Sequence, residues 1–147
     1  TMSDVVAYFD WLGGEVTDAP DRRARIEAAG RAIHAQEAAL AEAALHGVDN
    51  LPGLADMPGV HILGGVENPG REGLVSFWVD GHDAAEIVAA LNAEGVRTHT
   101  RKADHYSGNV LEPLGLSSCV RVSFCHYNSR EEVARLLSTV KSLLDAG

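Results

Sequence analysis

Residues 118–125 carry the side chain best suited to binding chemistry, a single arginine in an otherwise strand-like stretch. Every second residue is apolar, at Val120, Val122 and Phe124, and Arg121 lies between them. Because strand side chains point to opposite faces at successive residues, the apolar set predicts a core-facing surface and places Arg121 on the other face. A guanidinium there must be solvated or paired. The alternation alone leaves open both an anion-binding arginine and a solvated surface arginine.

The two cysteines and seven histidines are the other side chains that could do chemistry. In an extended strand, Cys119 and Cys125 lie roughly 20 Å apart, too far for a disulfide, and free thiols favour a reducing, cytoplasmic location. Cys125 and His126 are adjacent, so they point to opposite faces and form no nucleophile–base pair. Because the histidines and cysteines lack the short spacings of zinc ligands, the sequence predicts no metal site.

Length and charge restrict the class of protein. The chain has 147 residues, 46% of them hydrophobic and 22% charged, which is typical of one globular domain. The 12 basic and 21 acidic residues give a net charge of −9. This balance argues against nucleic acid and anionic membranes as partners, because both require a basic surface. No apolar run approaches the roughly 20 residues of a membrane span. We therefore expect a single domain over residues 1–147.

Two helices are predicted in the first third of the chain. The first spans residues 3–12 and ends at the glycine pair 13–14. The second spans residues 21–46, where alanine, glutamate and arginine are frequent, and Thr17 or Asp18 can cap it. At about 1.5 Å per residue this helix is on the order of 40 Å long, so it must project past the sheet or serve as a spine.

Alternating and helical periodicities follow one another in the rest of the chain. We expect strands at 60–63, 73–80, 96–100 and 119–125, helices over 83–94 and after the cap residue Ser129, a polar loop at 101–107 and a helical turn at 109–114. This order predicts an α+β fold, a two-layer sandwich in which a sheet of about four strands has helices on one face. Residues 1–14 would be a docking helix or hinge, and residues 15–147 the remaining lobe.

The sheet face turned away from the helices is predicted to be mixed in character. Leu74, Trp78, Cys119 and Cys125 share it with Arg121 if the strands alternate as expected. So apolar a face is not typical of plain solvent-exposed surface. We therefore expect another domain or a second subunit to pack there.

Several segments together carry a family resemblance: Y-F-D-W-L-G-G (8–14), D-R-R-A-R-I-E-A-A (21–29), R-E-G-L-V-S-F-W-V (71–79), A-A-L-N-A-E-G-V-R (89–97), L-G (114–115) and V-R-V-S-F-C-H-Y-N-S-R-E-E-V (120–133). The chain resembles the C-terminal lobe of the class V aminotransferase family. These are fold-type I PLP (pyridoxal phosphate) enzymes that include cysteine desulfurases and selenocysteine lyases. The most specific piece is R-x-S-x₃-Y-N followed by an acidic helix start. The fold that the resemblance implies is the small domain of these enzymes.

The resemblance implies a site on this chain. Arg121 matches the arginine that pairs with the α-carboxylate of an amino-acid substrate, a bidentate role that lysine fills poorly. Residues 99–108 match a mobile loop that reaches the cofactor. The candidate substrate-binding residues are Arg121, His105, Tyr106, Ser107, Arg101 and His99. This loop lacks the catalytic cysteine of the desulfurases, which favours an aminotransferase, lyase or epimerase reaction.

The resemblance also implies partners. PLP is expected in the parent enzyme, held as a Schiff base by a lysine. The only lysines here are Lys102 and Lys141, and neither lies in the family's histidine–lysine motif. We therefore expect no cofactor on this chain alone, no activity alone, a separate N-terminal PLP-binding lobe, an amino-acid substrate and a homodimeric parent enzyme. The alternatives are a non-catalytic regulatory module that binds an amino acid through Arg121, and a dimerisation module that uses Leu74 and Trp78.

Overall fold

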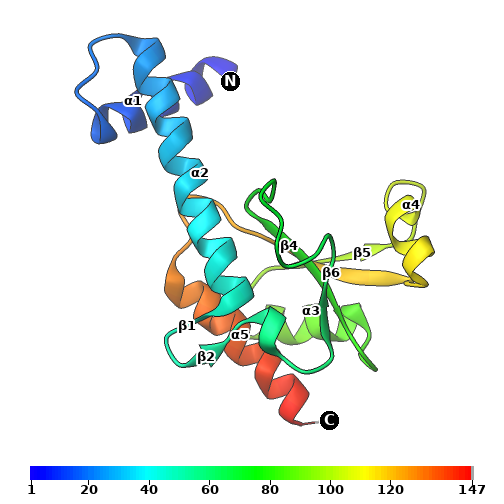
Figure 1. Cartoon of the computed structure of the whole chain (residues 1–147). Helices are drawn as coiled ribbons and strands as arrows, with labels where there is room; N and C mark the ends of the chain where they lie inside the picture. The colour runs from blue at the N-terminus through cyan, green and yellow to red at the C-terminus, as the bar shows by residue number, and fades with distance from the viewer. Residues whose placement is uncertain (147) are drawn as a thin grey trace.

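The computed structural model describes residues 1–146 and places a four-stranded antiparallel sheet against helices (Figure 1). The elements are α1 (Met2–Val16), α2 (Arg22–His46), β1 (Gly47–Val48), β2 (Leu51–Pro52), the 3₁₀ turn η1 (Leu54–Asp56), β3 (Val60–Ile62), β4 (Leu74–Val79), α3 (Ala84–Ala93), β5 (His99–Lys102), α4 (Gly108–Leu111), the 3₁₀ turn η2 (Glu112–Leu114), β6 (Ser118–Ser123) and α5 (Arg130–Asp145). The sheet has the strand order β3-β4-β6-β5, and β1 and β2 form a separate hairpin. The predicted α+β class is confirmed.

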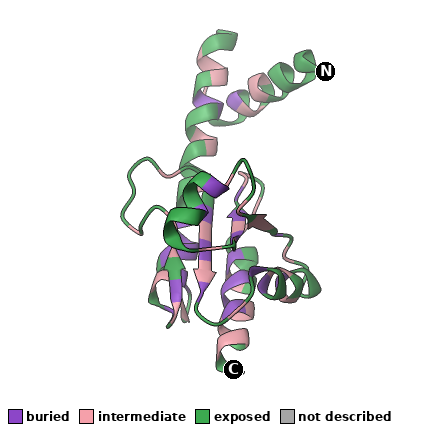
Figure 2. Cartoon of the chain, turned by 90° about the vertical axis from the view of Figure 1, so that its right-hand side faces the viewer, coloured by how far each residue is buried: buried purple, intermediate pink, exposed green. Residues whose placement is uncertain are grey.

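One face of the sheet forms the core, as the alternation predicts. Val75 and Phe77 of β4 and Val120 of β6 are fully buried, and the helices that cover them are α2, α3 and α5 (Figures 1 and 2). In α5 the buried positions are Val133, Leu136, Leu137 and Val140. Burying a side chain of this size contributes on the order of 1.5–3 kcal/mol, so this layer fixes the positions of the central strands β4 and β6.

The first two helices form a hairpin that projects beyond the sheet (Figure 1). The expectation that the glycine pair ends the first helix is wrong, because α1 continues to Val16. Gly13 is buried in the crossing of α1 and α2, where a Cβ would lie 2.0 Å from the carbonyl oxygen of Arg25. The glycine therefore serves close helix packing rather than termination.

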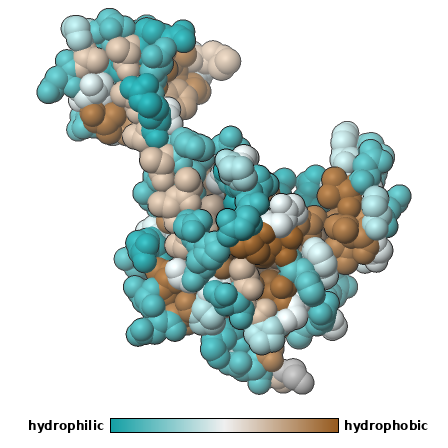
Figure 3. Space-filling view, viewed as in Figure 1, coloured by the Kyte–Doolittle hydropathy of each residue, from teal (hydrophilic) through white to brown (hydrophobic). Residues whose placement is uncertain are grey.

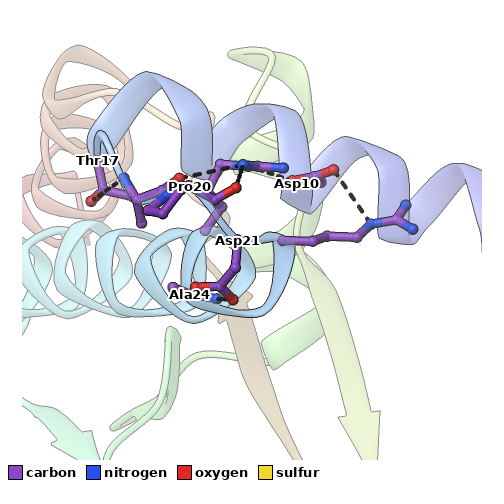
Figure 4. Close-up of polar contacts among 8 residues, drawn as sticks. Asp10, Thr17, Pro20, Asp21 and Ala24 are labelled. Carbon is purple, nitrogen blue, oxygen red and sulfur yellow. Dashed lines mark hydrogen bonds and ion pairs between the residues drawn. The ribbon is translucent and has the colours of Figure 1, made fainter.

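Polar contacts fix the turn between α1 and α2 (Figure 4). The cap of α2 is Asp21, whose carboxylate accepts the N–H of Ala24 at 2.9 Å, and not Thr17 or Asp18 as the sequence indicates. Thr17 instead accepts the N–H of Ala19 within the turn, at 3.3 Å. Arg25 donates from Nε to Asp10 at 2.6 Å and ties the two helices together.

Other boundaries also differ from the expected ones. The strand predicted at 96–100 lies at His99–Lys102, because Gly95 takes a left-handed conformation and the N–H of Val96 bonds back to Leu91 at 2.8 Å. The strand predicted at 119–125 ends at Ser123. The helical turn expected at 109–114 is confirmed as α4 and η2, and the structure adds a hairpin of β1 and β2 that the sequence does not predict. None of the helices in residues 1–146 combines the length and the hydropathy that crossing a bilayer requires.

Candidate functional site

Arg121 lies in the middle of the sheet, on the face turned away from the core helices. It stands directly opposite Ser76 of β4 on one side and His99 of β5 on the other. Next to this row, Cys119 of β6 stands opposite Arg101 of β5. Directly paired residues of antiparallel strands project to the same face, so the register brings both arginines to one surface.

A cavity of about 180 Å³ opens on this surface. Its polar lining consists of the two arginines and the hydroxyl-bearing side chains Ser76, Tyr106 and Ser107, and its remaining lining is Leu63, Val110, Leu111 and Cys119. The segment of α4 and η2 folds back over the β5 side, which buries Leu111 and Cys119. The chain's own turns therefore cover part of the sheet face on which we expected another domain or subunit to pack. Apolar side chains gather over α4 in the space-filling view (Figure 3).

Arg121 is partly buried, which separates it from a solvated surface arginine. Its Nε is shielded from solvent and has no hydrogen-bond partner among residues 1–146. A buried donor without an acceptor costs on the order of 1–3 kcal/mol, so the arrangement favours an acceptor arriving from outside. A carboxylate fits best, because it satisfies two guanidinium N–H groups at once.

The loop after β5 is ordered by Asp104. Its carboxylate accepts the N–H groups of Tyr106 and Ser107 at 2.9 and 3.0 Å. These two hydrogen bonds hold the pKa of Asp104 below its ordinary value, and the bond from Ser107 has the larger effect. Arg101 then donates from Nη2 to the hydroxyl of Ser107 at 3.3 Å. The loop therefore presents Tyr106 and Ser107 to the cavity beside Arg101.

The six residues predicted for the site divide into two groups. Four of them, Arg121, Arg101, Tyr106 and Ser107, line the cavity together. His99 lies opposite Arg121 but is exposed outside the cavity lining, and the exposed ring of His105 packs on Tyr106 with 3.9 Å between centroids. Their roles in binding stay predictions.

Sequence reasoning did not place Ser76 or Leu111 in the site. The alternation of β4 predicts that Ser76 lies on this face, two residues before Trp78, but it does not predict that Ser76 lines the cavity. Leu111 reaches the cavity only because the turn after β5 folds back, and no periodicity in residues 108–114 indicates that.

The cysteines differ in their surroundings. Cys119 is buried in the cavity wall, and burial raises the pKa of its thiol although Arg101 and Arg121 act in the opposite direction. Cys125 lies beyond the end of β6, where its N–H donates to the side chain of Asn128 at 2.8 Å. Within residues 1–146, no group of three or more histidine, cysteine, aspartate or glutamate side chains is arranged to hold a metal.

The corner that follows the arginine strand is fixed by a cap. Ser129 begins α5 as the sequence predicts, and its N–H donates to the carboxylate of Glu132 at 2.8 Å. Asn128 donates its side-chain amide to the same carboxylate at 3.0 Å. The Y-N-S-R-E-E segment therefore anchors the end of the strand that carries Arg121.

Neither lysine of the chain fits a cofactor lysine. Lys102 is exposed at the end of β5, and Lys141 forms an ion pair with Asp145 one turn further along α5. Neither lines the cavity that contains Arg121. The residues present therefore do not fit covalent PLP binding by this chain.

Comparisons with known proteins place the chain. The model of the family described as aminotransferase class-V matches residues 25–136. A probable cysteine desulfurase 1 of Mycobacterium leprae is 38% identical over 96 residues, which are 65% of this chain and 15% of that protein. A probable cysteine desulfurase 2 of the same organism is 34% identical over 115 residues, 78% of this chain and 26% of that protein.

A solved structure has the same fold over most of the chain. The apo structure of a cysteine desulfurase from Thermococcus onnurineus covers 86% of this chain and 30% of that chain, with a TM-score of 0.66 and 28% sequence identity. The chain thus spans under a third of the length of each of these three relatives. Because the family model covers the sheet, the cavity and the start of α5, the chain belongs to the class V aminotransferase family and is cysteine desulfurase-like.

Proposed function

We propose that this chain is the C-terminal lobe of a PLP-dependent enzyme that acts on an amino acid, and that Arg121 binds the α-carboxylate of the substrate. The observation that carries the proposal is the buried Nε of Arg121, which has no partner among the described residues and is therefore available to donate to a bound carboxylate. Family membership supports it, because the match spans the strand of Arg121 and the loop before it.

The chain's own residues would bind and orient the substrate. The guanidinium of Arg121 presents a planar pair of donors to a carboxylate, and the partly buried position strengthens that bond relative to one in water. The hydroxyls of Ser76 and Ser107, which also line the cavity, can accept or donate to the bound group. PLP would supply the electron-withdrawing chemistry, and its lysine would come from another lobe.

An aminotransferase, lyase or epimerase reaction suits this lobe better than desulfuration through a loop cysteine. Residues 101–107 contain no cysteine. Cys119 does line the cavity, but it is buried and burial raises its pKa, which disfavours the thiolate that nucleophilic attack requires.

The proposed partners are a PLP-binding lobe and, in the whole enzyme, a second subunit. Residues 1–14 would serve as the docking helix, because α1 exposes the large apolar side chains Met2, Val5 and Trp11. Trp78 of the sheet stacks on His61 with centroids 4.8 Å apart. Trp78 is already half-buried within the chain, which weakens the alternative of dimerisation through that residue.

Expression of the chain with and without its upstream coding sequence tests the proposal. The longer protein should show the visible absorbance of lysine-bound PLP, and the 147-residue chain with added PLP should not. In the longer protein, Arg121→Lys should raise KM for the amino acid more than it lowers kcat, and Arg130→Lys, an exposed arginine of α5, serves as the control. PLP absorbance in the 147-residue chain would contradict the lobe assignment. Tight amino-acid binding by that chain would instead favour a regulatory module.

A further inference from the structure

The cavity beside Arg121 has an unusual charge for this protein. Two guanidinium groups line it, from Arg101 and Arg121, and no carboxylate is among its lining residues. The chain as a whole carries a net charge of −9. The nearest acidic group in the loop, Asp104, already accepts two backbone N–H groups and lies outside the lining. The cavity is therefore a positive site on a negative protein.

The two arginines are neighbours across the sheet. Arg101 of β5 stands opposite Cys119 of β6, and Arg121 is two residues further along β6. The two arginines are therefore diagonal neighbours on the same face of the sheet. Such diagonal neighbours have Cα atoms about 7–8 Å apart, within reach of long side chains. The thiol of Cys119 lines the same cavity as both guanidinium groups.

The guanidinium groups of Arg101 and Arg121 differ in their hydrogen bonding. Arg101 donates to the hydroxyl of Ser107, a neutral acceptor at 3.3 Å, while the Nε of Arg121 has no acceptor among the described residues. One carboxylate on Arg121 would leave the charge of Arg101 facing the same cavity. A ligand with two anionic groups would neutralise both, and like charges held this close favour such a ligand over a monoanion.

We propose that Arg101 is a specificity-determining residue that selects an amino acid with an acidic side chain. The α-carboxylate would bind Arg121 and the side-chain anion would bind Arg101, with Ser107 holding the second guanidinium in place. This inference rests on the proposed function of Arg121 and adds a substrate class to it. Phosphate offers related dianion chemistry, so the experiment includes it as a separate arm.

Amide NMR titration of the 147-residue chain tests the proposal at constant ionic strength, with L-aspartate, L-alanine and inorganic phosphate as probes. Both amino acids should bind this lobe weakly, because the proposed cofactor lobe is missing, and L-aspartate should bind with a Kd about tenfold below that of L-alanine, a difference of about 1.4 kcal/mol. Arg101→Gln should raise the Kd of L-aspartate to that of L-alanine and leave L-alanine unchanged. Arg101→Lys should keep part of the preference. Arg97→Gln, an exposed arginine outside the cavity, is the matched control, and the spectra report whether each variant is folded.

Each other outcome has a distinct meaning. Equal binding of L-aspartate and L-alanine, no binding of either, or an L-aspartate preference that survives Arg101→Gln would overturn the proposal. Phosphate binding tighter than L-aspartate and lost in Arg101→Gln would overturn it in favour of a phosphoryl group. If Arg121→Gln leaves L-alanine binding unchanged while Arg101→Gln removes the aspartate preference, the role proposed for Arg121 fails and charge selection by Arg101 stands.

Discussion

The hydroxyl of Tyr8 and Nε2 of His126 share a hydrogen bond of 2.7 Å, although the two residues are 118 positions apart in the chain. Tyr8 belongs to α1, and His126 follows the strand that carries Arg121. The rings also lie against each other, with centroids 5.9 Å apart. The projecting helical hairpin and the strand of the candidate site are therefore joined directly, and not only through the core.

Tyr8→Phe should loosen this connection. It removes a hydrogen bond worth about 0.5–1.5 kcal/mol, and the lower end is expected because the contact is exposed. Hydrogen exchange should become faster in α1 and in the segment around His126, with little change in the sheet. Tyr106→Phe, an exposed tyrosine in the loop after β5, is the control. Unchanged exchange in α1 would mean that the bond contributes nothing to docking.

Gly13→Ala should disrupt the crossing of α1 and α2. The new Cβ would lie 2.0 Å from the carbonyl oxygen of Arg25, a backbone atom that cannot move aside without shifting the helix. We expect a loss of about 1–3 kcal/mol in the free energy of unfolding, measured by urea denaturation. Gly14→Ala is a matched control, because its Cβ would lie 3.8 Å from its nearest neighbour, the Cδ of Arg25. That variant should gain about 0.5–1 kcal/mol from helix propensity, and equal losses in both would refute the packing role of Gly13.

Acid should destabilise the turn before α5, where Asn128 and Ser129 donate hydrogen bonds to the carboxylate of Glu132. The side-chain amide of Asn128 and then the N–H of Ser129 hold the pKa of Glu132 below its ordinary value. A lowered folded-state pKa contributes stability that is present above the unfolded value of about 4.3 and is lost as pH falls through the folded value. Carboxyl NMR titration should find this low pKa, and Asn128→Ala should raise it. An ordinary pKa for Glu132 in the unchanged chain would be inconsistent with the cap.

The two thiols should differ in reactivity. Cys125 is partly exposed, whereas Cys119 is 2% exposed and its pKa is raised by burial. A disulfide reagent at neutral pH should therefore modify Cys125 first, and Cys125→Ala should leave one thiol that reacts slowly until urea unfolds the chain. Fast modification of Cys119 in the folded chain would show that the cavity opens often, and would reopen the case for Cys119 as a nucleophile.

Features set by local periodicity could be predicted from the sequence. The alternation of residues 119–125 predicts the core face and places Arg121 opposite it, and the serine ahead of two glutamates predicts the start of α5. These signals are reliable because one strand or one cap decides them without reference to the rest of the chain.

Features that depend on a neighbouring element could not be predicted in this way. The glycine at position 13 looks like a helix end until Arg25 lies against it. Arg101 looks like a loop residue until pairing with Cys119 extends β5. In the same way, the closing of α4 over Cys119 depends on the burial of Leu111, which only the assembled sheet provides.

The turns that follow β5 cover one side of the cavity, through Val110 and Leu111. The segment from Gly108 to Leu114 is two short turns, anchored on the cavity by the fully buried side chain of Leu111. So short a segment opens by local unfolding more readily than by moving as a rigid flap. The time that a ligand waits to exchange would then depend on how often the side chain of Leu111 leaves its place. A single leucine would in this way act as a kinetic gate.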